Sequence, residues 1–426
     1  MQQRFVDPLK CGKSLHPTGR LEYRGGSREC LMTDSAINRL HALGRKLQTP
    51  RVSPLRRARS KALLPARFLR ALYQSWQAAE VYGAAVELTY GIPRRKQAFQ
   101  LWHLMMRYSF SMDDYYRFRL YRFDSATTAL FLPLGEYMAV RELLYDSLGL
   151  ERDLLADKRM FYRACEKAGL PVPITIADFK NGKIHWWSGV SLPSCNLFSK
   201  EAAAMGGAGA VLWRYAAPTL LWTGQNGDAL DADGVIRHLC AASQQAPILL
   251  QRCLSNHLEL AEIAPSGVST VRVVTIRRTR EASPSVIATV LRVPTGGNVA
   301  DNFARGGLAC PIDMNNGVLG PAVRKNLDQA HLDVLRHPDT GAFIDGLRLP
   351  MWEQIVDLAL RAHATFDCYP SVGWDIAITP EGPVLMEGNY NWGVLLAQQP
   401  GCRPIGATPY PDHFFSWFEK CQNEQN

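Results

Sequence analysis

The 426-residue sequence lacks the features that mark several large classes of protein. No run of about eighteen apolar residues occurs, so we expect no transmembrane helix. The first residues lack the apolar core of a secretory signal peptide, which favours a cytoplasmic protein. No Cys-x-x-Cys pair is present and no histidines cluster near the cysteines, so a zinc site is not expected. The sequence also has no Gly-x-Ser-x-Gly motif, which argues against a serine hydrolase of that type.

The composition is that of a folded protein, with 47% hydrophobic and 20% charged residues. This balance excludes a largely disordered chain. A chain of this length does not need disulfide bonds for stability, so we expect the cysteines to be reduced and mostly buried. The ten cysteines are scattered at positions 11, 30, 165, 195, 240, 253, 310, 368, 402 and 421.

The positive charge is concentrated at the N-terminus. The net charge is +9, but residues 1–70 alone carry sixteen Lys and Arg against four Asp and Glu. A basic segment ahead of a near-neutral body suggests an anionic partner, which would be a membrane surface, an acidic polymer or nucleic acid. The alternative is a solvated, partly disordered arm that binds nothing.

The pattern of apolar residues divides the chain into helical and mixed parts. Residues 1–60 are rich in Arg, Pro and Gly and predict a basic extended arm. Residues 61–150 show helical spacing and predict a helical N-terminal region. Further helices are predicted at Lys158–Gly169, closed by its glycine, and at Leu349–Phe366. Helices followed by mixed strands and helices indicate the α+β class. Strands are predicted at 174–176, 184–187, 211–215, 248–251, 269–277 and 285–293, the last two forming a pair.

The clearest chemical signal is the segment Gly373–Asn389, which reads GWDIAITPEGPVLMEGN. Two apolar strands flank Pro380-Glu381-Gly382, which suits a three-residue hairpin loop closed by Thr379 and Pro383. Counting back along both strands places Asp375 opposite Glu387, about 5 Å apart. Asn389 lies two residues further on and shares their face.

Two carboxylates and one amide oxygen would therefore converge on one place. Like charges so close repel unless a proton or a cation lies between them. An all-oxygen set suits Mg²⁺ or Mn²⁺, so Asp375, Glu387 and Asn389 are candidate metal ligands. The alternative is a surface hairpin with solvated acids, but the flanking Trp374 and Ile376 favour burial.

These residues resemble a known family. The pattern D-x₁₁-E-x-N is similar to the magnesium signature of ATP-grasp ligases. The longer string resembles the sugar-transfer-associated ATP-grasp family, which is related to α-L-glutamate ligases. The similarity extends in order through TVRVVTI (Thr270–Ile276), DNFARGG (Asp301–Gly307) and HPDTG (His337–Gly341). It implies an ATP-grasp fold after the helical region, with two α+β subdomains that hold ATP between them. They would be N-terminal and lid subdomains at 151–250 and a C-terminal catalytic subdomain at 251–426.

The resemblance also implies which residues bind ATP. Lys158 and Lys200 match the two nucleotide-binding lysines, although Lys158 also suits an ordinary helix start. The glycines Gly206, Gly207 and Gly209 match a flap over the phosphates. The linker that binds adenine through its backbone would be Gln251, Arg252, Cys253 and Leu254. Glu259 is a candidate for the ribose hydroxyls, against the alternative of a surface acid.

Four further residues are candidate catalytic groups. Arg272 lies on a strongly apolar strand, and a buried arginine needs an anionic partner such as a phosphate or carboxylate. By resemblance, Arg272 and Arg292 face the transferring phosphoryl group, together with Asn302 and Arg305. Structural ion pairs are the alternative for the arginines.

The resemblance implies an ATP- and Mg²⁺-dependent ligase, with Mn²⁺ as a possible substitute. A small-molecule or peptide carboxylate would be phosphorylated, and an amine would displace phosphate. Two alternatives remain open, a kinase that uses the same site and a non-catalytic adaptor in a glycan-assembly complex. Phosphate release would indicate ligation, whereas a stable phosphorylated acceptor would indicate a kinase. The three converging oxygens argue against an adaptor.

Overall fold

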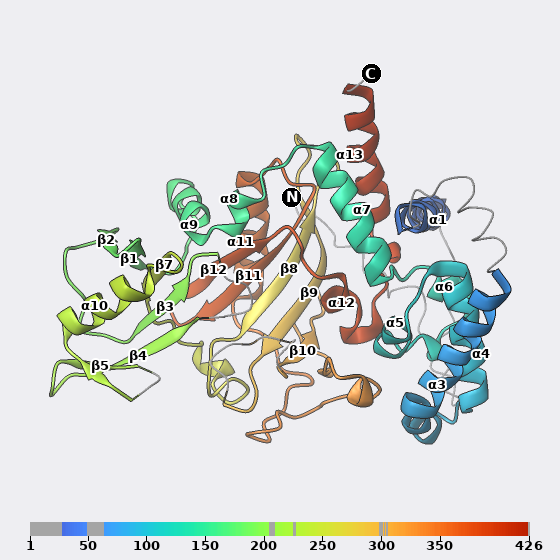
Figure 1. The fold of residues 1–426 in the computed structure, drawn as a ribbon, viewed down its shortest axis with the longest axis horizontal. Helices are drawn as coiled ribbons and strands as arrows, with labels where there is room; N and C mark the ends of the chain where they lie inside the picture. Colours follow the sequence, from blue (N-terminus) through green and yellow to red (C-terminus); the bar gives the residue numbers. More distant parts are fainter. Residues whose placement is uncertain are drawn as a thin grey trace.

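The computed structural model describes residues 28–48, 64–203, 209–224, 227–297, 301, 303 and 306–424. In this part of the chain the strands form two sheets, one of seven strands and one of five. Figure 1 shows the two sheets side by side, with most helices gathered beyond the five-stranded sheet. No helix in the described ranges is long and apolar enough to cross a membrane.

The five-stranded sheet is antiparallel throughout. Its strands are β8 (Thr270–Ile276), β9 (Ser285–Val293), β10 (Leu308–Pro311), β11 (Ser371–Thr379) and β12 (Gly382–Asn389). They lie in the order β10-β9-β8-β11-β12. Every residue of β8 and β11 is buried, as expected for strands covered on both faces. The predicted pairing of β8 with β9 is confirmed.

The hairpin of β11 and β12 has the predicted pairing of Asp375 with Glu387, but it reaches this register differently. The predicted three-residue loop is wrong, because Thr379 pairs with Gly382 and leaves two residues in the turn. The register then shifts by one residue beyond the pair of Ile376 and Leu385. This irregularity restores the expected pairing, because an extra residue in one strand offsets the shorter loop.

Helices cover the face of this sheet that carries Trp374. The indole of Trp374 packs against Phe366, with ring centroids 5.7 Å apart, at the end of α11 (Trp352–Thr365). The predicted helix at 349–366 is thus confirmed with a slightly later start. The helix predicted at 158–169 is also confirmed as α9 (Lys158–Lys167), which Asp157 caps by accepting from the Arg159 N–H at 2.9 Å. The short helix α8 (Asp153–Ala156) precedes it.

The seven-stranded sheet packs against α10 (Ala232–Ala242). Its strands are β1 (Thr175–Lys180), β2 (Lys183–Trp186), β3 (Leu197–Glu201), β4 (Val211–Ala216), β5 (Leu221–Thr223), β6 (Ala229–Leu230) and β7 (Ile248–Arg252), in the order β2-β1-β7-β3-β4-β5-β6. The apolar pattern predicted β1, β2, β4 and β7 but missed the others and α10. The segment after β7 reaches the five-stranded sheet, where the His257 N–H donates to the Ile378 carbonyl at 2.7 Å.

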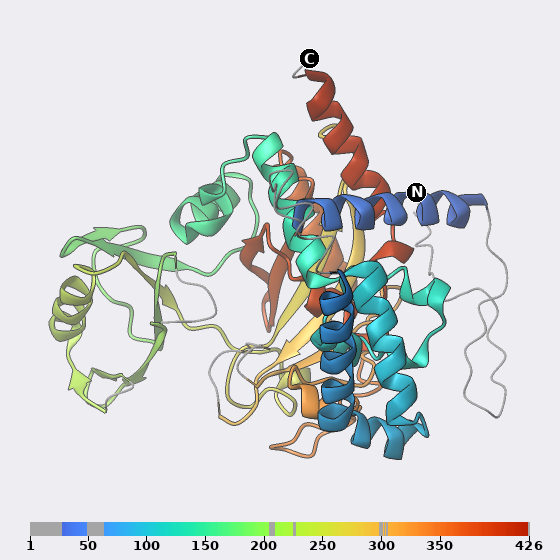
Figure 2. The ribbon, with the colours of Figure 1, turned by 45° about the vertical axis from the view of Figure 1, so that its right-hand side comes forward.

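The prediction of an extended arm over residues 1–60 is wrong for α1 (Arg28–Gln48). Ile37 and Leu40 of α1 are buried against the main core. His41 Nδ1 lies 2.5 Å from Glu136 of α7 (Leu134–Ser147), and both side chains are buried. Figure 2 shows α1 lying across the molecule near α13 (Tyr410–Glu424). Ile37, Leu40 and Leu47 do recur at helical spacing, but the Arg, Pro and Gly of the flanking sequence dominated the reading of residues 1–60. The rest of the arm lies outside the described residues.

A separate group of helices follows α1, as the helical spacing predicted. These are α3 (Leu64–Tyr90), α4 (Arg94–Tyr108), α5 (Met112–Arg117), η1 (Leu120–Arg122) and α6 (Ser125–Thr128). Arg119 joins them to the long loops of the five-stranded sheet by donating to the carbonyls of Ala330 and Leu332 and to Asp333. The remaining short elements are η2 (Leu258–Leu260), η4 (Leu327–Gln329), α12 (Val394–Gln398), η5 (Pro400–Cys402) and η6 (Ile405–Ala407).

Candidate functional site

The candidate metal ligands and arginines meet on one face of the five-stranded sheet. Arg272 on β8 lies directly opposite Asp375 on β11, and Asp375 lies opposite Glu387 on β12. Asn389 is two residues beyond Glu387, so its side chain shares the same face. Arg292 on β9 is paired with Thr270, two residues before Arg272, and joins the same face. The side chains of four strands therefore converge.

Two guanidinium groups hold Asp375. Arg272 donates from Nε to Oδ1 and from Nη2 to Oδ2, the latter at 2.9 Å. Arg292 Nη2 donates to the same Oδ2 at 2.8 Å. Burial alone would raise the pKa of Asp375, but the two guanidiniums outweigh it and hold the pKa below its usual value. The partner expected for a buried Arg272 is thus a carboxylate in this structure.

A buried acid that the sequence analysis did not single out supports Arg292. Asp301 Oδ2 accepts from the backbone N–H of Thr270 at 2.9 Å and from its hydroxyl at 2.5 Å. The Thr270 hydroxyl oxygen in turn accepts from Arg292 Nη2 at 2.6 Å, and Asp301 Oδ1 lies 3.5 Å from the same nitrogen. Burial raises the pKa of Asp301 in spite of the nearby guanidinium. The signal was available, because Asp301 begins the DNFARGG string.

Lys158 and Glu387 connect α9 to the hairpin. Lys158 Nζ lies 3.1 Å from Glu387 Oε1, and the lysine side chain is buried while the carboxylate is one-third exposed. The backbone N–H of Lys158 donates to the Ala202 carbonyl at 3.1 Å, which fixes the start of α9 against the end of β3. Asn389 Nδ2 is 3.4 Å from Asp375 Oδ2. Glu387 and Asn389 therefore both have a partner within the cluster.

Lys200 approaches the same place from the other sheet. Its ammonium donates to the Tyr162 hydroxyl at 2.9 Å, and that hydroxyl donates to the Met386 carbonyl on β12 at 2.8 Å. Burial lowers the pKa of Lys200 to about 8, against an opposing effect of the Glu387 charge. Tyr162 was not anticipated as a site residue, although its place one turn after Lys158 put it on the same side of α9.

Comparison with known proteins identifies this arrangement. The model of the sugar-transfer associated ATP-grasp family matches residues 149–405, which is more than half of the chain.

The chain belongs to this ATP-grasp family. The resemblance expected from Gly373–Asn389 and the upstream strings is therefore confirmed, as is the ATP-grasp fold with a helical N-terminal region. The match begins just before α8 and ends near η6, so α1 and α3–α7 precede the family region. No curated protein matches the chain.

Three solved structures illustrate how distant the structural relatives are. An ADP complex of N5-carboxyaminoimidazole ribonucleotide synthetase is 12% identical, with a TM-score of 0.31, covering 55% of this chain and 45% of that chain. A D-alanine–D-alanine ligase from Bacillus anthracis is 11% identical, with a TM-score of 0.35, covering 64% and 69%. An L-amino acid ligase from Bacillus licheniformis is 10% identical, with a TM-score of 0.33, covering 60% and 46%. The chain spans less than half the length of the first and third.

The hairpin carries oxygen donors of the kind that a hard divalent cation prefers. In the described ranges no three His, Cys, Asp or Glu side chains cluster closely enough to hold a metal. The candidate set is instead two carboxylates and one amide, Asp375, Glu387 and Asn389, on one face of the hairpin. Oxygen donors of this kind suit Mg²⁺, which keeps water and phosphate oxygens as its other ligands.

The predicted adenine linker joins the two sheets. Gln251 is buried at the end of β7, where its amide donates to the Thr175 hydroxyl at 3.0 Å. Arg252 is exposed, and its backbone N–H donates to the Ile174 carbonyl at 3.0 Å. The Cys253 N–H donates to the Asn196 carbonyl at 3.0 Å. These bonds fix Gln251–Cys253 in an extended path into Leu254, which stays a prediction as an adenine contact.

The structure does not bring Glu259 to the cluster. Its side chain is exposed on η2, and its backbone N–H donates to the ring of His257 at 3.3 Å. Its proposed contact with a ribose therefore stays a prediction. Of the predicted flap, Gly209 has φ +68°, which favours glycine, and lies against Glu201. Four predicted residues lie outside the described ranges, namely Gly206, Gly207, Asn302 and Arg305.

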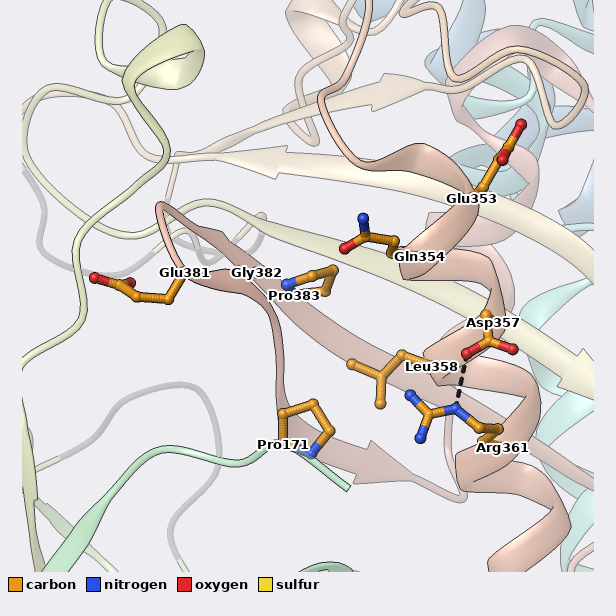
Figure 3. Close-up of a pocket in the computed structure, with 9 residues that line it drawn as sticks. All are labelled: Pro171, Glu353, Gln354, Asp357, Leu358, Arg361, Glu381, Gly382 and Pro383. Carbon is orange, nitrogen blue, oxygen red and sulfur yellow. Dashed lines mark hydrogen bonds and ion pairs between the residues drawn. The ribbon is translucent and has the colours of Figure 1, made fainter. Parts of the chain in front are cut away.

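A cavity of about 500 Å³ lies away from this cluster, between the tip of the hairpin and α11 (Figure 3). It is on the side of the sheet that Trp374 faces, whereas the neighbouring Asp375 points to the opposite side. Among its lining residues Arg361 Nε donates to Asp357 Oδ2 at 2.7 Å. The lining residues are Pro171, Glu353, Gln354, Asp357, Leu358, Arg361, Glu381, Gly382 and Pro383. We assign it no part in the ATP site.

Proposed function

We propose that the chain is an ATP- and Mg²⁺-dependent carboxylate–amine ligase. The observation that carries the proposal is the convergence of Arg272, Arg292, Asp375 and Glu387 on one face of the sheet, with Lys158 and Lys200 arriving beside them. Cations gathered around few carboxylates suit a polyanionic substrate such as ATP. Membership of the ATP-grasp family supports the same choice.

The residues have separate proposed roles. Asp375, Glu387 and Asn389 would hold the Mg²⁺ ion, which lowers the charge repulsion among the ATP phosphates. Lys158 from α9 and Lys200 from β3 bind phosphate oxygens as point charges. The backbone of Gln251–Leu254 borders the adenine. The roles of the side chains are proposed from their place in the cluster, and that of the Gln251–Leu254 backbone from the family resemblance.

Arg272 and Arg292 have the proposed role of stabilising charge on the phosphoryl group. When ATP enters, its phosphates compete with Asp375 for the guanidiniums, because both are anionic acceptors of bidentate hydrogen bonds. Arg272 and Arg292 then stabilise the negative charge as a substrate carboxylate attacks the γ-phosphate. The products of this step are an acyl phosphate and ADP. An amine next attacks the acyl carbon, which forms an amide and releases phosphate.

The substrates are a small-molecule or peptide carboxylate and an amine. The family description, which associates these proteins with sugar transfer, suggests a place in the synthesis of a polysaccharide, a glycoconjugate or a peptide natural product. This pathway assignment rests on the family description alone. The roles proposed for the described site residues concern ATP and the phosphoryl group, and none of them identifies the carboxylate substrate.

A substrate panel tests the proposal. Purified protein is incubated with ATP, Mg²⁺ and pairs drawn from amino acids, peptides and sugar acids, and ADP, phosphate and product mass are measured. The proposal expects equal release of ADP and phosphate and a product that lacks phosphorus. Glu387→Ala should lose this activity, whereas Glu381→Ala at the hairpin tip should keep it. A stable phosphorylated product would show a kinase instead and would refute ligation.

A further inference from the structure

The helix α3 carries large apolar side chains that are exposed rather than packed in the core of the helical region. Its buried line includes Ala71, Ala78 and Val86, which pack in the helical region. A second line of large apolar residues runs along the N-terminal half of α3 with the spacing i, i+3, i+4, i+7, which places all four on one flank. They are between 39% and 63% exposed, and they are Leu69, Leu72, Tyr73 and Trp76.

The exposed flank continues on α4. Phe99 and Met106 are 63% and 45% exposed, and Trp102 lies between them with the spacing i, i+3, i+7. Trp102 joins the two helices, because its ring lies 4.7 Å from that of Phe68 on α3 and 5.5 Å from that of Phe99. We call Phe68, Leu69, Leu72, Tyr73, Trp76, Phe99, Trp102 and Met106 the α3–α4 patch. Contiguous exposed apolar surface of this kind marks an interaction site.

Positive charge surrounds the patch. Arg70, Arg95, Lys96 and Arg107 are exposed on the same two helices. Within the described residues none of these four side chains forms an ion pair. The two acidic residues of these helices, Glu80 and Glu87, both form ion pairs with Arg94, at 2.6 and 3.2 Å. The patch is therefore apolar and aromatic at its centre, and its two helices hold six Arg and Lys against two Glu.

The charge decides between two possible occupants. A second copy of the chain binding through the same face would place like charges opposite each other, because a twofold interface brings identical patches together. An anionic lipid surface has the opposite charge, and it accepts Trp, Tyr and Phe rings at the level of the headgroups. A helix pair with aromatic residues on one flank and Arg and Lys beside them has the composition of an interfacial membrane anchor.

We propose that the α3–α4 patch docks the protein on a membrane surface rich in anionic phospholipid. The helices lie in the headgroup region, with the aromatic and aliphatic side chains inserted and the four cations next to lipid phosphates. Figure 1 shows α3 and α4 at one end of the molecule and the seven-stranded sheet at the other. Docking through the patch therefore leaves the space between the two sheets open to ATP.

The sequence just before α3 has the same sign of charge. Residues 51–63 hold five Arg and Lys and no Asp or Glu.

Vesicle flotation tests the proposal on the full chain. The protein is mixed with vesicles of phosphatidylcholine alone and with vesicles in which part of the lipid is phosphatidylglycerol. One variant replaces the apolar centre, Leu69→Ser with Trp76→Ser and Phe99→Ser. A second replaces only charge, Arg95→Gln with Arg107→Gln, and covers the case in which the first fails to fold. The matched control is Val190→Ser with Leu220→Ser, which removes two exposed apolar residues elsewhere.

We expect the native chain and the control to float with the anionic vesicles and not with phosphatidylcholine alone. The apolar variant should lose flotation, and each neutralised cation should weaken it about fivefold. Equal flotation with both lipids, flotation of the native chain that neither variant reduces, or no flotation at all would overturn the proposal. Light scattering on the same samples identifies the other occupant. A native dimer that the apolar variant turns into a monomer, without vesicle binding, would show a second copy and would also overturn it.

Discussion

The ammonium of Lys200 is the group in the site whose protonation changes near neutral pH. Burial lowers its pKa to about 8, whereas an unfolded lysine titrates near 10.5. Bound phosphate favours the charged amine, so ATP binding takes up a proton where Lys200 is neutral. Between these two pKa values the unfolded chain holds more protons, so this lysine makes the folded state more stable as the pH rises.

We therefore expect the affinity for Mg²⁺–ATP to fall as the pH rises through about 8. Isothermal titration at a series of pH values measures it. Lys200→Gln should bind ATP more weakly and lose this part of the pH dependence. Lys158→Gln is the matched control, since it should bind more weakly but keep the dependence. Identical pH profiles for Lys200→Gln and the native chain would contradict the assignment.

Asp301 provides a second test at the residue scale. Asp301→Asn removes the negative charge that holds Thr270 and Arg292, so the guanidinium loses its orientation. We expect the rate constant kcat of ADP formation to fall about tenfold or more, with the KM for ATP nearly unchanged. Asp345→Asn on an exposed loop should change neither. A variant that loses thermal stability but keeps the kcat of the native chain would show that Asp301 has only a structural role.

At the scale of elements, the hairpin is where the sequence was most informative. Alternating apolar residues and a Pro-Glu-Gly turn were enough to place Asp375 opposite Glu387. The turn length was wrong by one residue, and the shift after Ile376 compensated for it. A pattern of period two predicts which residues share a face, but it does not reveal an irregularity such as the one between Asp375 and Ile376.

At Gly388 the hairpin packs so closely against the core that it leaves no room for a side chain. A Cβ atom there would lie 2.9 Å from Leu155 Cδ2 and from Trp374 Cζ3, which are both enclosed in the core. Gly388→Ala should lower the free energy of unfolding by about 1–3 kcal/mol, because the core must shift to admit the methyl group. Gly135→Ala is the control, since its Cβ meets only the end of the Gln48 side chain. Urea unfolding measures both, and equal midpoints would contradict the close packing.

The sequence pattern did not predict β3 or several residues of the site. The strand β3 holds Lys200, but its residues Leu197–Glu201 include no β-branched residue and three polar ones, so they give little strand signal. Asp301, Thr270 and Tyr162 join the site through contacts between residues far apart in the chain. Such contacts depend on how the two sheets and α9 pack, which no local pattern records.

At the scale of the whole molecule, a buried arginine ties the helical region to the loops of the five-stranded sheet. Arg119 is buried and holds the carbonyls of Ala330 and Leu332, both at 2.9 Å, and the carboxylate of Asp333 at 2.7 Å. The helices α3–α6 are therefore fixed to the body rather than appended to it. The sequence predicted their helical nature but gave no sign of this contact.

Arg119→Met should leave those carbonyls without a donor and lower the free energy of unfolding by about 3 kcal/mol. Hydrogen exchange should also rise in residues 327–333. The control is Arg122→Met, because Arg122 is exposed and only stacks on Tyr90 at 5.3 Å. Urea unfolding and exchange mass spectrometry make the comparison. If both variants unfold at the same urea concentration as the native chain, the helical region is not held in this way.

The central claim is that the face bearing Asp375, Glu387 and Asn389 binds ATP together with Mg²⁺. Isothermal titration of ATP into the native chain, with Mg²⁺ and with a chelator, tests it directly. The same titration is made on Glu387→Ala and on Glu381→Ala from the tip of the same hairpin. The account predicts that ATP binds only when Mg²⁺ is present, that Glu387→Ala weakens binding at least about tenfold and that Glu381→Ala leaves it unchanged. Binding that is independent of Mg²⁺, or equal in Glu387→Ala and the native chain, would contradict it.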